Sequence, residues 1–350
     1  MQIIWLSQAK VQKATVDRLD LVMPQIDQVG GIRPFASVTL ADHADKRPTS
    51  KFSRVAFSHA YRSAGCIARQ GCSASSCACQ HPVQSALTAN MLLFDHPLSS
   101  YCQKVKIALR EKGVAFDTVL PPDLGSGQRE TLLTEANPRG EVPALIVDGA
   151  AIFDSTIIME FVDERWPEPA LLPADPLARA FARETEEICD THYEAVNWGF
   201  GEILWFERAK GVLAAQLKAA AARDTAVLQS WLTDRLGGAD WFGGDEFGWA
   251  DAAAAPMVNR SVYYGLGPAS GSPLYRWHQR LCARPTVAAT FSEFQIAAER
   301  MASLSNVYTT GGRRREYRDH RLEWMVRSGG IGVVSDGLAA GNIRFSWPAE

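Results

Sequence analysis

The chain has 350 residues, 47% of them hydrophobic and 21% charged, and its formal net charge at pH 7 is −3. This length predicts about two domains. The balanced charge argues against a nucleic-acid-binding protein, which would carry a strongly basic face. No apolar run approaches the roughly 20 residues that a membrane-spanning helix needs, so we expect no membrane segment.

Cysteine usage indicates the compartment. Four of the seven cysteines lie within residues 66–79 and the other three are far apart, unlike the even set of a small secreted disulfide protein. The first residues, MQIIWLSQAK, lack the basic start and apolar core of a secretory signal. We therefore predict a cytoplasmic protein with reduced cysteines.

Residues 1–90 differ from the rest of the chain. Pro24 interrupts their one amphipathic pattern, and the later part is small and polar without a period. We expect a disordered extension or, alternatively, a mis-assigned start with Met91 as the natural first residue. The cysteine spacing is unlike that of paired zinc ligands, so we predict no metal site. The residues considered for it are Cys66, Cys72, Cys77, Cys79 and His81.

Regular elements begin at Met91. Residues 91–95 are typical of a buried strand, a helix follows to about Gly113, and residues 114–120 are typical of a second strand. The helix has an apolar face, and Gly113 is a natural helix stop. This part is therefore predicted to be a βαβ unit.

A second group of elements follows a looser segment. Asp148-Gly149 is a strong hairpin signal between strands over residues 142–147 and 151–153. A helix is predicted over residues 155–166. The order βαβ followed by ββα predicts a mixed α/β domain.

The remaining chain is predicted to be helical. Prolines mark residues 167–175 as a linker, and the Ala-rich residues 176–304 lack strand-like alternation. Gly248 and Asp251 are spaced as in a helix capping box. Residues 305–350 form an extension that we expect to be helical and to pack on the helical domain. Its packing residues are Tyr317, Leu322, Trp324 and Met325.

Four motifs occur along the chain in a set order. They are the S-x-x-C-x-x-V-x-x-A-L run from Ser99, NPRGEVP over residues 137–143, FDSTII over residues 153–158, and Ala250-Asp251. Together they resemble the cytosolic glutathione S-transferase family, in its Ser-type, bacterial-like form, over about residues 91–304. The resemblance implies a thioredoxin-like, glutathione-binding domain over residues 91–166, an all-α C-terminal domain over residues 176–304, and a homodimer.

Ser99 is the candidate catalytic residue that the resemblance implies. In the family, a Ser, Tyr or Cys at this place contacts the glutathione sulfur. A free thiol has a pKa of about 8.5, and both a hydroxyl hydrogen bond and a helix N-terminus favour its thiolate form. Two alternatives remain at this point: Ser99 only caps the helix, or a shift of one residue makes Ser100 the catalytic hydroxyl.

The resemblance also implies a set of glutathione-binding residues. The residue before a cis-proline pairs its backbone with the cysteinyl part of glutathione, and this residue is Val142. Asp154 and Ser155 match the pair that binds the γ-glutamyl end, at the start of a helix. The full set is Arg139, Val142, Pro143, Asp154 and Ser155.

Glu141 departs from the family pattern. Several classes have a lysine there that binds the glycyl carboxylate of glutathione, and a glutamate would repel this carboxylate. Arg139 or Lys104 would have to substitute, or Glu141 would have to point to solvent.

The electrophile is expected to bind between the two domains. The aromatic candidates come from THYEAVNWGFGEILWF, although aromatic residues at helical spacing often belong to a core. We assign Tyr193 and Trp198 to this pocket, consider Trp205 and His192 for it, and give His192 no role.

Cys102 is expected to be a core residue, because it falls on the apolar face of its helix and free cysteine is usually buried. The leading hypothesis is therefore a glutathione transferase, whose bound thiolate attacks a hydrophobic electrophile without a metal. One alternative is a non-catalytic protein-interaction module on the same fold. The other is a Cys102-dependent thiol transferase.

Overall fold

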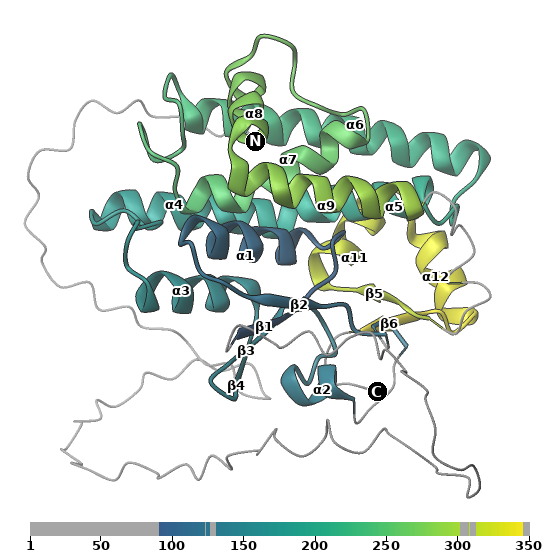
Figure 1. The fold of residues 1–350 in the computed structure, drawn as a ribbon. Coiled ribbons are helices and arrows are strands. Elements are labelled where there is room, and N and C mark those ends of the chain that lie inside the picture. Colours follow the sequence, from purple (N-terminus) through teal and green to yellow (C-terminus); the bar gives the residue numbers. More distant parts are fainter. Residues whose placement is uncertain (1–90, 123, 127–130, 302–307, 309–312, 346–350) are drawn as a thin grey trace, which may run out of the picture. The chain divides into compact units, whose positions relative to one another are not determined.

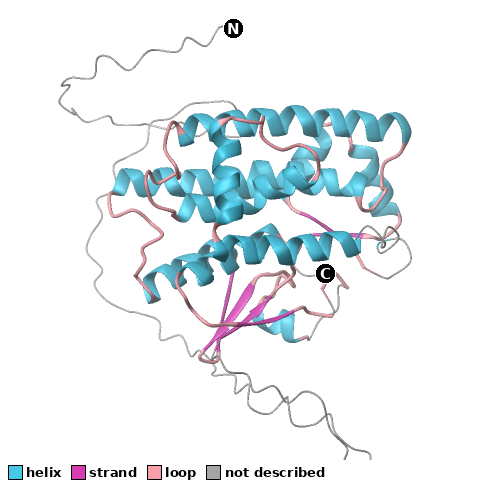
Figure 2. Ribbon diagram, turned by 45° about the horizontal axis from the view of Figure 1, so that its top comes forward, coloured by secondary structure: helices cyan, strands magenta, loops and turns pink. Residues whose placement is uncertain are grey.

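The computed structural model describes residues 91–122, 124–126, 131–301, 308 and 313–345 (Figures 1 and 2). The expectations for residues 1–90, namely disorder, a start at Met91 and the absence of a metal site, lie outside the described residues. Within the described part, no helix is both long and apolar enough to cross a bilayer.

A four-stranded mixed sheet begins the described chain. Its strands are β1 (Met91–Phe94), β2 (Asp117–Val119), β3 (Ala144–Val147) and β4 (Ala150–Phe153), in the order β2-β1-β3-β4. β1 is parallel to β2 and antiparallel to β3, which is antiparallel to β4. Asp148 and Gly149 have φ angles of 49° and 79°, as the predicted two-residue hairpin turn requires.

Three helices accompany the sheet: α1 (Ser100–Glu111), α2 (Leu132–Ala136) and α3 (Ser155–Arg165). In Figure 1, α1 and α3 lie on the side of the sheet that faces the other helices, and α2 lies on the opposite side. The short α2 falls in the segment that the sequence suggested to be loose. It is held by a local capping arrangement between Thr131 and Thr134 rather than by a long apolar stripe.

The second part of the chain is helical, as predicted. Its main elements are α4 (Pro176–Ile188), the π-helical turn η1 (Cys189–Tyr193), α5 (Glu194–Leu204), α6 (Gly211–Leu236), α7 (Trp249–Tyr263), α8 (Pro273–Ala283) and α9 (Pro285–Met301). α7 is almost entirely buried and packs on both α1 and α4. Asp251 accepts a hydrogen bond from the backbone N–H of Gly248 (3.0 Å) and another from Nε1 of Trp277 (2.7 Å), which fixes the start of α7.

The described residues 313–345 form what we call the C-terminal segment. It contains β5 (Arg315–Tyr317), α11 (Asp319–Arg327), α12 (Ile331–Ala339) and β6 (Ile343–Phe345), and β5 pairs in parallel with β6. The expectation of an all-helical extension was therefore incomplete: two three-residue strands flank the helices. Such short, charge-rich strands have no alternation long enough to be read from sequence.

α11 fastens the C-terminal segment to α5. Trp324 is 2% exposed, and its ring lies directly on Gly199, where a Cβ atom would come within 2.2 Å of the ring. Met325 and Tyr317 are also buried, and Leu322 is partly buried against the same cluster. The predicted packing of these residues on the helical region is thus confirmed (yellow in Figure 1).

Candidate functional site

A cavity of about 370 Å³, here called the Ser99 cavity, lies where the start of α1 meets α5, α7 and the C-terminal segment. Ser99 and Ser100 both line it at the end of β1 and the start of α1. Val142, which precedes β3, lies on the same wall.

Ser99 is the N-cap of α1. Its Oγ accepts a hydrogen bond from the backbone N–H of Cys102 at 3.3 Å, which satisfies one of the free donors at the helix start. The same hydroxyl also interacts with the Cys102 thiol, which opposes the effect of burial on the pKa of that thiol, and it lines the cavity. Capping and binding are therefore compatible roles of one hydroxyl. Ser100 is 3% exposed, and its Oγ has no hydrogen-bond partner in the described part of the chain.

Cys102, in the first turn of α1, is fully buried. Burial, with a smaller contribution from Asp95, raises the pKa of its thiol. A thiol of this kind stays protonated and unreactive at neutral pH, so Cys102 is a core residue, as the sequence indicated.

Two predicted aromatic residues differ in their placement. Trp198 lines the Ser99 cavity, together with Trp205. Tyr193 does not line it; this residue is fully buried in the helical core, where its hydroxyl accepts a hydrogen bond from Nε2 of Gln229 at 3.0 Å. Tyr193 ends the π-helical turn η1, and Trp198 follows five residues later in α5, so their side chains lie on different faces of the helical run. Tyr264 on the cavity wall was not identified from the sequence, because its helix shows no pattern that distinguishes wall from core.

The five predicted glutathione-binding residues come together around a second, much smaller cavity of about 10 Å³. They are Arg139, Val142, Pro143, Asp154 and Ser155. The Val142–Pro143 peptide bond is cis, as the resemblance implies. Asp154 caps α3 by accepting a hydrogen bond from the N–H of Thr156 (3.1 Å), and it pairs with Nη2 of Arg139 at 3.3 Å.

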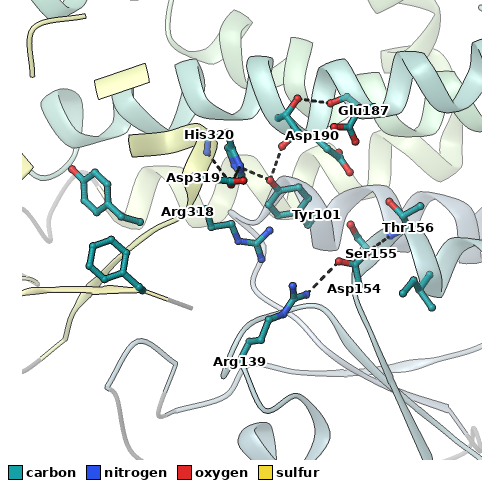
Figure 3. Close-up of a pocket in the computed structure, with 14 residues that line it drawn as sticks. Tyr101, Arg139, Asp154, Ser155, Thr156, Glu187, Asp190, Arg318, Asp319 and His320 are labelled. Atoms are coloured by element: carbon teal, nitrogen blue, oxygen red, sulfur yellow. Dashed lines mark hydrogen bonds and ion pairs between the residues drawn. The ribbon is translucent and has the colours of Figure 1, made fainter. Parts of the chain in front are cut away.

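A third cavity, of about 760 Å³, opens outward from this place (Figure 3). Arg139, Asp154 and Ser155 line its inner side. The facing side belongs to the C-terminal segment, where Arg318 and His320 project toward Tyr101 (Figure 3). Tyr101 donates a hydrogen bond to the backbone oxygen of Asp190 at 2.7 Å.

Arg318 is the one residue of the C-terminal segment that lines all three cavities. Its guanidinium lies over the ring of Tyr101, 5.2 Å from the centroid, and donates a hydrogen bond to Oε2 of Glu141. Arg318 thus stands between the Ser99 cavity and the residues assigned to the γ-glutamyl end of glutathione. Nothing in the local sequence connects it to them.

Glu141 is 4% exposed and does not point to solvent. Besides Arg318, it has Nε of Arg139 at 3.5 Å. Burial and the neighbouring Glu316 raise the pKa of Glu141 to about 7, against the opposing effect of the two arginines. Much of the repulsion expected toward a glycyl carboxylate is therefore offset within the protein.

Lys104 cannot substitute for the missing lysine. Its ammonium is fully buried and pairs with Glu186 and Asp190, so it serves the contact between α1 and the helical region. Glu186 also accepts a hydrogen bond from Nε1 of Trp249. This ion cluster is structural.

Two family models match the chain: the glutathione S-transferase N-terminal domain over residues 93–170 and the C-terminal domain over residues 208–285. Glutathione S-transferase U28 of Arabidopsis thaliana is 30% identical over 229 residues, which cover 63% of this chain and 96% of that protein. A stringent starvation protein A homolog of Coxiella burnetii is 26% identical, over 58% of this chain and 92% of its own length.

The solved structures agree with the sequence relatives. A rice glutathione S-transferase in complex with glutathione superposes with a TM-score of 0.51 at 26% identity, covering 62% of this chain and 98% of the rice protein. The two proteins share the mixed sheet followed by helices, which is the fold that the sequence motifs of this chain implied. The chain belongs to the cytosolic glutathione S-transferase family.

Proposed function

We propose that the protein is a glutathione transferase in which Ser99 holds the glutathione sulfur as a thiolate. The observation that carries this proposal is the position of Ser99, which caps α1 and lines the Ser99 cavity. Family membership and the relative named glutathione S-transferase support the same activity.

The chemistry follows from this position. A sulfur in the cavity would accept the Ser99 hydrogen bond and lie near the N-terminus of α1, and both favour the anion. The thiolate attacks an electrophilic carbon held against the aromatic wall; a carbon–sulfur bond forms and a leaving group departs or a double bond is saturated. The thiol proton passes to solvent.

The proposed binding of glutathione uses the small cavity. Ser155 and Asp154 would hold the γ-glutamyl end and the backbone of Val142 the cysteinyl part, with Arg139 beside them. This cavity measures only about 10 Å³, and Arg318 borders it. Asp154 and Ser155 also line the cavity of about 760 Å³ and Val142 the Ser99 cavity, so the tripeptide would reach from one to the other past the side chain of Arg318. Membership of the family supports a homodimer and a cytoplasmic location, which complete this proposal and are testable by sedimentation and cell fractionation.

The same constriction favours a second candidate, a non-catalytic interaction module. It predicts that Arg318 stays in place and that glutathione does not bind. The relative named stringent starvation protein A homolog is consistent with a family member of another role.

One experiment decides between these two functions. Glutathione is titrated into the full chain by calorimetry, and the bound state is scanned in the ultraviolet for thiolate absorbance. The transferase proposal predicts binding with a thiolate signal that Ser99→Ala removes and Ser100→Ala keeps. If glutathione does not bind at millimolar concentration, the interaction module is the better proposal; if Ser100→Ala alone removes the signal, the catalytic hydroxyl is Ser100.

A further inference from the structure

The Ser99 cavity is unusually rich in cations. Seven arginines and three glutamates line it. The arginines are Arg260, Arg313, Arg314, Arg315, Arg318, Arg321 and Arg344. All except Arg260, which lies on α7, come from the C-terminal segment.

Several of these arginines are neutralised by carboxylates. Arg321 forms a two-point pair with Glu194, at 2.8 and 3.0 Å, and Arg344 pairs with Glu316. The first pair joins the C-terminal segment to α5, and the second joins β6 to β5 within the segment. In both, a carboxylate balances the positive charge of the arginine.

Arg260 has no such partner. It is 6% exposed, and its Nε and Nη2 atoms make no hydrogen bond to any residue that the structure describes. Its guanidinium lies 5.7 Å from the ring centroids of both Trp205 and Phe294. Glu194 lies close enough to attract Arg260, but its oxygens are bonded to Arg321 and His320. Aromatic faces attract a cation but do not accept its N–H groups as a carboxylate does, so the two buried nitrogens of Arg260 stay unsatisfied, which is costly.

Other polar groups on the wall also lack hydrogen-bond partners. Nε1 of Trp198, Nε1 of Trp205 and Oη of Tyr264 are buried without a hydrogen-bond partner among the described residues. The pKa of His96, on the same wall, is lowered to about 4 by burial and by nearby cations, of which Arg260 contributes most. His96 is therefore neutral at pH 7 and adds no charge of its own.

We propose that the Ser99 cavity binds a small aromatic organic anion, whose carboxylate is the missing counter-ion of Arg260. The aromatic body is recognised by Trp198, Trp205 and Tyr264, which border the same space. A volume of about 370 Å³ suits a one-ring ligand. The inference rests on the proposed transferase function and names the class of its electrophile.

We do not assign glutathione itself to Arg260. Of its five assigned residues only Val142 also lines the Ser99 cavity, and Arg260 is absent from the residues that line the small cavity. The anion therefore belongs to the second substrate, placed beside the sulfur that Ser99 would hold. A cationic wall also offsets the repulsion between that anion and the thiolate.

A matched pair of electrophiles tests the charge preference. Chlorodinitrobenzoate, with its chlorine para to the carboxylate, is compared with the corresponding neutral primary amide. In both, the glutathione thiolate attacks the carbon that bears chlorine, a carbon–sulfur bond forms, and chloride leaves with the bonding electron pair. We expect kcat/KM for the benzoate to exceed that for the amide by about tenfold, as for a charge-assisted hydrogen bond, mainly through KM.

Variants assign the preference to one side chain. Arg260→Met should remove the tenfold ratio, and Arg260→Lys, which keeps the charge, should restore part of it. Arg280→Met, which alters a partly exposed arginine of α8 bonded to the backbone oxygen of Asp240, should leave the ratio unchanged. An equal ratio in Arg260→Met and the parent protein would overturn the proposal.

A binding measurement separates this inference from the transferase function. Dinitrobenzoate without chlorine, and its amide, are titrated into the full chain by calorimetry in the absence of glutathione. Benzoate binding that Arg260→Met weakens about tenfold supports the anion site even if no electrophile turns over. Turnover of both electrophiles with equal binding of benzoate and amide would overturn the anion site and leave the transferase function standing.

Discussion

Arg318 and Glu141 are in direct contact although 177 residues separate them in the sequence. Glu141 belongs to the loop before the cis-proline, and Arg318 follows β5 in the C-terminal segment. The contact places an arginine from the end of the chain beside the residues assigned to glutathione. It also neutralises a carboxylate where several classes of the family have a lysine.

The first prediction concerns this pair. Arg318→Ala removes an arginine that lowers the pKa of Glu141, so this carboxyl should be more fully protonated and should not repel the glycyl carboxylate more strongly. The variant also opens the small cavity that Arg318 borders, so KM for glutathione should fall, by about tenfold. Adding Glu141→Gln to Arg318→Ala should change KM little further, because Glu141 is then already uncharged. Steady-state kinetics with glutathione varied provides the measurement. A higher KM in Arg318→Ala would show that Arg318 binds glutathione and does not obstruct it.

The second prediction concerns the pH dependence of stability. The pKa of Glu141 is raised to about 7 in the folded protein, so this residue holds a proton that the unfolded chain releases above about pH 4.5. Stability should therefore fall as the pH rises from 4.5 to 7, by at most about 1.4 kcal/mol per pH unit from this group, and level off above that. Glu141→Gln should reduce the fall.

Denaturant unfolding between pH 5 and 8 measures this effect. Glu323→Gln, at an exposed position of α11, is the matched control and should keep the parent slope. Some decline should persist in Glu141→Gln, because burial also raises the pKa of Asp190 to about 7. An unchanged slope in Glu141→Gln would mean that Arg318 and Arg139 keep this carboxylate ionised.

The third prediction concerns Cys102. Because its thiol is buried and its pKa is raised, Cys102→Ala should keep conjugation within about twofold while lowering the free energy of unfolding by about 1 kcal/mol. Activity and denaturant unfolding are measured on the same sample. Loss of turnover in a folded Cys102→Ala protein would instead favour the thiol transferase.

The fourth prediction concerns the contact between α11 of the C-terminal segment and α5. A Cβ at position 199 would overlap the ring of Trp324, so Gly199→Ala should destabilise the protein by about 1–3 kcal/mol, the range for overpacking. Gly332→Ala, in α12 with open space around it, should be neutral or stabilise by up to about 1 kcal/mol. Thermal or denaturant unfolding compares the two. Equal stability of Gly199→Ala and Gly332→Ala would show that α11 does not rest on α5 in solution.

Much of the fold could be predicted because its signals are local. The Asp148-Gly149 turn, the S-x-x-C run and the Gly248–Asp251 spacing each reside within a few residues, and each corresponds to an element that the structure contains. The short α2 escaped prediction because five residues leave no periodicity to detect.

The candidate site was predictable only where it follows such motifs. Arg318 was missed because its role depends on Glu141, which is distant in the sequence. Arg260 was missed because the sequence does not show that two of its nitrogens lack a hydrogen-bond partner among the described residues. Tyr193 and Trp198 occur five residues apart in the same helical run, yet only Trp198 lines the cavity. Five residues at 3.6 residues per turn place two side chains about 140° apart around the helix, so the spacing itself argues against a shared wall.

The charged and the aromatic residues of the Ser99 cavity come from different parts of the chain, and this bears on how its substrate selectivity could change. Six of its seven arginines belong to the C-terminal segment, whereas Trp198, Trp205 and Tyr264 belong to the helical region. Charge and shape are thus encoded in separate stretches of the chain. Exchange or redesign of the C-terminal segment could therefore change the charge of the Ser99 cavity, while its aromatic residues and the Ser99 hydroxyl stay the same.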